Sequence, residues 1–65
     1  MSFHSYIVGR ELLMTDPPFS ALIMAAMRKA DTDNSRRLRA MWPEIHDELQ
    51  ARYNAPGGYL EGEHD

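Results

Sequence analysis

Seven consecutive apolar residues, Ala21 to Met27, lie in the middle of a chain of only 65 residues. Successive residues of a helix point about 100° apart, so this run goes almost twice round and leaves the helix without a polar side. Such a helix must be covered on every side, and a short chain offers few other elements to cover it. We therefore predict a homo-oligomer that uses this helix, whose apolar side chains are divided between protomer core and interface: Leu22, Ile23, Met24 and Met27.

The size of the chain and its lack of cysteine also favour association. A folded chain of 7.5 kDa has a surface of roughly 4,250 Å² and buries only about 60% of the surface of its unfolded form. The sequence contains no cysteine, so neither a disulfide nor a cysteine-based zinc site can supplement this marginal core. Association between copies is the remaining means of stabilisation.

Charge and hydropathy argue against two classes of protein. The net charge of −3 and the isoelectric point near 5.5 argue against general DNA binding, which needs a basic surface. No basic segment precedes an apolar run at the N-terminus, so we expect no signal peptide. The apolar run of seven residues is far shorter than the ~20 residues of a membrane span. We expect a cytoplasmic protein that has no membrane partner.

Apolar residues at helical spacing predict an all-α fold, a small bundle of three to four short helices completed by homo-oligomerisation. Residues 2–14 follow this spacing, although Gly9 and the β-branched pair Ile7–Val8 keep a short strand open as the alternative there. Asp16 is a suitable cap for a second helix over residues 17–30, because a proline at the first helical position loses no hydrogen bond.

Two further helices are predicted after a polar turn. Residues 31–34 can cap a third helix, which runs from Ser35 to about Met41. Pro43 disfavours helical geometry at the residue before it, so the chain kinks there and a fourth helix restarts. An apolar stripe continues across the kink and should pack on the second helix: Leu38, Met41, Trp42, Ile45, Leu49 and Tyr53.

We expect one helical domain over residues 1–58, because a proline and two glycines at 56–58 end the last helix. Residues 59–65 then form an acidic C-terminal tail. This tail should be ordered only where Tyr59 and Leu60 dock on a neighbouring chain.

The sequence offers no convincing metal or catalytic site. Residues 31–35 begin like a calcium loop, but Arg36 stands where that loop needs glycine and Trp42 where it needs glutamate. No two of the three histidines, His4, His46 and His64, have the spacing of metal ligands on a helix. No serine lies in a nucleophile elbow. We therefore predict a protein that is not an enzyme and has no cofactor or bound metal.

A basic cluster is the best candidate for a binding site. Six of the seven basic residues lie between positions 28 and 52, so an anion site can exist inside an acidic protein. Arginine suits phosphate oxygens, and an aromatic face can stack on a base. The candidate ligand-binding residues are Arg28, Lys29, Arg36, Arg37, Tyr53 and Tyr59. The alternative is that the arginines pair with carboxylates of the oligomer, those of Glu44, Asp47 or Glu48.

Three segments carry a resemblance to other proteins. They are Pro-Phe-Ser-Ala-Leu-Ile-Met-Ala-Ala-Met at 18–27, Trp-Pro-Glu at 42–44 and Arg-Tyr-Asn-Ala-Pro-Gly-Gly at 52–58. This pattern resembles a group of short phage and prophage proteins that have no assigned activity, so no functional residue is transferred. The resemblance implies a phage protein in the cytoplasm of an infected bacterial host.

Small phage proteins of this kind often act by binding, and this analogy suggests three functions. The first is a counter-defence protein that sequesters a small anionic ligand, such as a cyclic-nucleotide-like signal, at sites between protomers. The second is a protein–protein inhibitor or adaptor that binds a host complex, such as a host defence protein. The third is a structural phage component.

Overall fold

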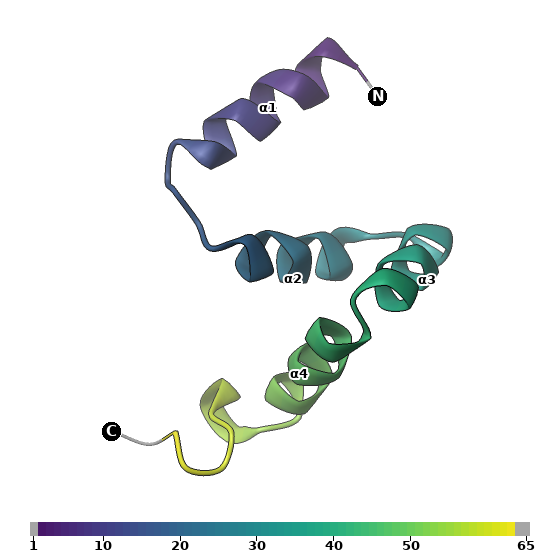
Figure 1. The fold of residues 1–65 in the computed structure, drawn as a ribbon. Coiled ribbons are helices and arrows are strands. Elements are labelled where there is room, and N and C mark those ends of the chain that lie inside the picture. The colour runs from purple at the N-terminus through teal and green to yellow at the C-terminus, as the bar shows by residue number, and fades with distance from the viewer. Residues whose placement is uncertain (1, 64–65) are drawn as a thin grey trace.

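The computed structural model describes residues 2–63, and within this range it contains helices and no strand (Figure 1). The predicted all-α fold is therefore confirmed. The elements in chain order are α1 (Phe3–Leu13), α2 (Phe19–Lys29), α3 (Thr32–Met41), α4 (Pro43–Tyr53) and a short 3₁₀ helix, η1 (Pro56–Gly58).

The connection between α1 and α2 differs from the prediction. Asp16 has a left-handed backbone with a φ of 49° and does not cap α2. That helix begins at Phe19, and its N-cap residue is Pro18, which provides no side-chain hydrogen bond. The predicted start at Pro17 was wrong because Pro18 disfavours helical geometry at the residue before it. The two prolines instead hold an extended connection between the helices.

The start of α3 confirms the predicted cap and corrects the helix boundary. Asp31 is the N-cap residue, and its carboxylate Oδ1 accepts a hydrogen bond from the backbone N–H of Asn34 at 2.9 Å. The helix therefore begins at Thr32 rather than at Ser35. An acidic side chain in this first turn, Asp33, is also favourable near the positive end of the helix dipole.

The core lies where α2, α3 and α4 pack against one another. Ile23 of α2 is 8% exposed, and among residues 2–63 it is the only buried residue. The ring of Phe19 packs edge-on against Trp42, with ring centres 5.9 Å apart. The apolar stripe on α3 and α4 is only partly inside, because Met41 and Tyr53 are 69% and 77% exposed.

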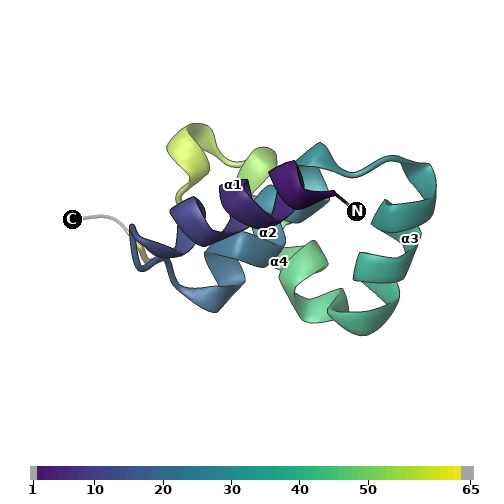
Figure 2. The same ribbon diagram turned by 90° about the horizontal axis from the view of Figure 1, so that it is seen from above.

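Helix α1 stands apart from this three-helix unit. It runs antiparallel to α2 in Figure 1 and lies over α2 when the molecule is seen from above in Figure 2. No Cα atom of α1 comes within 8 Å of a Cα atom in another helix. The radius of gyration is consequently 13.8 Å, against about 10.7 Å for a compact domain of this length.

No helix within residues 2–63 has the length and apolar character needed to cross a membrane.

Candidate functional site

A groove between α1, the end of α2 and α3 contains two of the predicted ligand-binding residues. We call it the basic groove, and its volume is about 900 Å³. Lys29 reaches it from the last turn of α2, and Arg37 reaches it from α3. The other lining residues are Ser5, Ala26, Ala30, Asp31, Asn34, Leu38, Met41 and Trp42.

The two cations of the basic groove have no partner of opposite charge in the part of the chain described. The ion pairs within residues 2–63 involve Arg36, His46 and Arg52, but neither Lys29 nor Arg37. The carboxylate in the groove, that of Asp31, accepts the capping hydrogen bond of α3. Lys29 and Arg37 are therefore available to an anion from solution.

Trp42 is a groove residue that the sequence analysis placed in the core. It follows α3 directly, with φ −131° and ψ 63°, because Pro43 prevents a continuous helix. Its ring is partly buried against Phe19 and also lines the basic groove. Aromatic rings offer an apolar surface to a nucleobase. The sequence did indicate this second role, because a large aromatic residue directly before Pro43 lies at the junction of two helices.

The remaining candidate residues lie elsewhere. Arg28 lies beside Lys29 and Arg52 in a groove of about 590 Å³ between α2 and α4, and it lines a smaller pocket of about 320 Å³ with Tyr53. Arg36 lies on the exposed side of α3, where its guanidinium is 3.6 Å from the Asp33 carboxylate. Tyr59 follows η1 and lies beside Gly57. The structure therefore brings Lys29 together with Arg37 in the basic groove, and Arg28 together with Lys29 or with Tyr53 elsewhere, but it does not gather all six predicted residues in one site.

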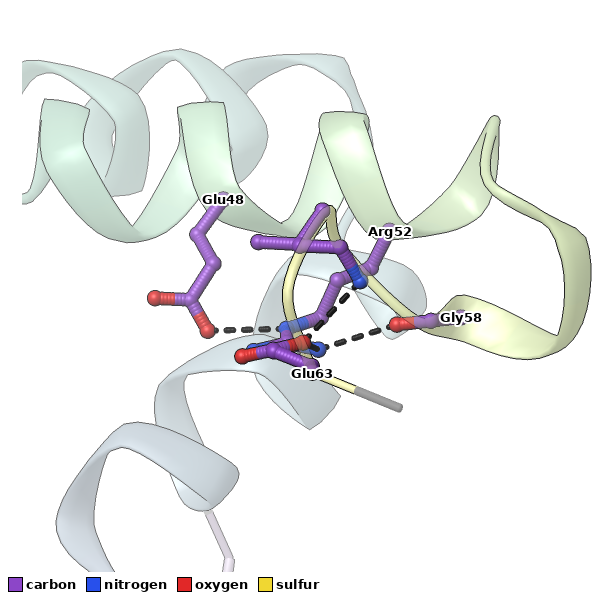
Figure 3. A network of polar contacts seen from close by, with 5 residues as sticks. Glu48, Arg52, Gly58 and Glu63 are labelled. Carbon is purple, nitrogen blue, oxygen red and sulfur yellow. Dashed lines mark hydrogen bonds and ion pairs between the residues drawn. The ribbon is translucent and has the colours of Figure 1, made fainter. Parts of the chain in front are cut away.

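Arg52 of α4, which was not among the predicted residues, organises the C-terminal part of the chain (Figure 3). Its Nε donates to the Glu48 carboxylate at 2.9 Å, one turn earlier in the helix. Both terminal nitrogens bind the two carboxylate oxygens of Glu63, at 2.8 and 2.9 Å. Nη1 also donates to the carbonyl oxygen of Gly58 at 2.9 Å.

These contacts place the tail within its own chain. Up to Glu63 the tail is folded back on α4, where Arg52 binds the Glu63 carboxylate. The backbone N–H of Leu60 also donates to the Glu63 carboxylate at 3.0 Å. Glu63 lies 11 residues after Arg52. This separation is not a helical spacing, so the sequence did not predict that the two side chains pair. The last two predicted tail residues, His64 and Asp65, lie outside the described range.

The tail is expected to undock in acid. Hydrogen bonds from Arg52, and then from the Leu60 N–H, hold the pKa of Glu63 below its ordinary value. Hydrogen bonds to Glu63 and Glu48 raise the pKa of Arg52, so Glu63 is the partner that titrates. A lowered carboxyl pKa stabilises docking above the ordinary value of about 4.3, and this stabilisation is lost as pH falls through the docked pKa.

Amide exchange at Leu60 measures this transition. We expect protection of its N–H to be constant at pH values above the ordinary carboxyl pKa of about 4.3 and to be lost progressively as the pH falls below that value. Glu63→Gln should abolish the pH dependence, whereas Glu61→Gln, the neighbouring carboxylate, should leave it intact. Protection that persists in acid would contradict the assignment to Glu63.

Within residues 2–63 no group of three histidine, aspartate or glutamate side chains is arranged to hold a metal ion.

Comparison with known proteins adds no relative to this geometry, because no family model, no curated protein and no solved structure matches the chain.

Proposed function

We propose that this is a non-enzymatic phage accessory protein that counters host defence by binding and sequestering a small anionic ligand. The ligand class is a cyclic-nucleotide-like signal, which carries phosphate and an aromatic base. The observation that carries the proposal is the basic groove, where Lys29 and Arg37 have no carboxylate partner within residues 2–63 and Trp42 lies beside them.

The size and lining of the basic groove suit this ligand class. Its volume of about 900 Å³ lies within the range of roughly 300–1,000 Å³ that is typical of small-molecule pockets. Lys29 and Arg37 would bind phosphate oxygens by charge-assisted hydrogen bonds. Trp42 and Met41 would contact the base. The groove of one chain is open, which supports a site that a second protomer completes.

A second candidate function is inhibition of a host complex by protein–protein contact. The apolar surface of α1 favours it, since large exposed apolar patches often mark interaction sites. The acidic tail gives it less support than the sequence suggested, because Glu63 is engaged by Arg52. A structural phage component remains the third proposal, and no contact in the fold favours it in particular.

Native mass spectrometry tests the leading proposal. We would incubate the protein with cyclic mononucleotides, cyclic dinucleotides and, as the control, inorganic phosphate. At least one cyclic nucleotide should remain bound in a fixed ratio to the protein chains, whereas phosphate should not. Absence of any nucleotide adduct, together with an unchanged melting temperature, would reject sequestration and favour a protein partner.

A further inference from the structure

Within residues 2–63, α1 carries more exposed large apolar side chains than any other helix. Tyr6, Leu12 and Leu13 are 63%, 52% and 64% exposed, and Phe3 and Met14 at the two ends of the helix are more exposed still. This helix is apolar on more than one side, so burying one side against its own chain would not cover it. Exposure of this extent is uncommon in a chain that functions alone.

The side of α1 that faces α2 borders an apolar groove. Its volume is about 530 Å³, and it is lined by Tyr6, Gly9, Leu12 and Leu13 from α1 and by Leu22 from α2, with Ser5 and Arg10 of α1 as its polar members. A methyl group added at Gly9 would meet no atom within 4 Å. The two helices are therefore separated by space that another apolar element can fill.

The exposed area of the chain indicates how much surface a partner on α1 could bury. The surface measures 5717 Å², about 1,500 Å² more than a compact protein of this mass exposes. If two copies each covered this excess, the interface would bury about 3,000 Å². That value falls within the range of roughly 2,000–5,000 Å² found for obligate homodimers.

We infer that a second copy of this chain covers α1, with α1 of each copy seated in the groove between α1 and α2 of the other. Each chain offers both the exposed helix and the groove, so one two-fold axis satisfies both at once. The predicted interface on α2 would contribute Leu22, whereas Ile23 stays in the protomer core.

This inference goes beyond the proposed function, because the helix pairing does not require a ligand. It also bears on the ligand site. Ser5 lines both the α1–α2 groove and the basic groove, so the partner's helix would lie beside the ligand of the first copy.

The test is the mass of the ligand-free full chain in solution, measured by size-exclusion chromatography with light scattering. The wild type should have at least twice the chain mass of 7.5 kDa. Leu13→Asp should reduce the mass to that of one chain, because it places a carboxylate in the proposed interface. His4→Asp adds the same charge on the other side of α1 and should leave the assembly intact.

Hydrogen exchange separates this interface from one formed by α2 alone. Amides of residues 3–13 should be protected at high protein concentration and should lose protection on dilution, while those of α4 stay unchanged. A wild type that remains monomeric, or a Leu13→Asp variant of wild-type mass with protected α2–α4 amides, would overturn the inference. Neither result would depend on nucleotide binding, so a failure here is distinguishable from a failure of the proposed function.

Discussion

Replacing Ile23 by alanine is expected to unfold most of the protein at room temperature. Removing a buried isoleucine side chain costs about 2–5 kcal/mol, since the transfer free energy is lost and a cavity remains. A core of this size rarely supplies more than about 3–5 kcal/mol in total. Because Ile23 is the only buried residue within the described range, no second buried side chain there compensates for its loss.

Urea denaturation followed by circular dichroism measures this effect. The protein concentration is held fixed, because the inferred association would contribute to stability. Met41→Ala is the matched control, since it truncates a large apolar side chain that is 69% exposed. Its free energy of unfolding should change by less than about 0.5 kcal/mol. Equal effects of the two substitutions would show that Ile23 is not the central side chain of the core formed by α2, α3 and α4.

The second large effect is expected in ligand binding. Reversing both cations of the basic groove with Lys29→Glu and Arg37→Glu should weaken nucleotide binding at least a hundredfold. Each charge-assisted hydrogen bond contributes about 1.5–3 kcal/mol, and a factor of a hundred corresponds to about 2.7 kcal/mol. Isothermal titration calorimetry with the nucleotide found by mass spectrometry would measure the loss.

A control with the same change in net charge is available on α3. Arg36→Glu with Arg39→Glu reverses two cations that do not line the basic groove, and it should reduce the affinity only slightly. If this control abolished binding and the groove variant did not, the anion site would lie on the exposed side of α3. Retention of the wild-type mass by both variants would show that neither pair acts through the assembly.

Much of the fold could be predicted because the signals are local. Asp31 precedes a run of polar residues, and capping by its carboxylate needs only the next turn of helix. Pro43 stops α3 and starts α4 because its ring acts on the adjacent residue. The boundaries at Phe19 and Thr32 were missed by two and three residues. In each case the residue just before the helix decided where it begins: Pro18 before Phe19, and Asp31 before Thr32.

The candidate site was harder to predict because its residues come together through packing. Arg36 and Arg37 are adjacent and chemically alike, yet only Arg37 turns toward the end of α2. The two arginines differ because of the way α3 packs against α2. The spacing of residues within α3 does not reveal that packing. The pairing of Arg52 with Glu63 was missed for the same reason, since a turn folds the tail back between them.

The order of the helices along the chain has a consequence for folding speed. The packed elements α2, α3 and α4 follow one another directly. Only short loops therefore have to close before the contacts between these helices can form. Helical domains with such local contacts fold in about microseconds to milliseconds, whereas subunit assembly takes up to minutes and depends on concentration. If a second copy covers α1 as inferred, a newly made chain would complete its three-helix unit first, and α1 would stay exposed to solvent until enough copies have accumulated.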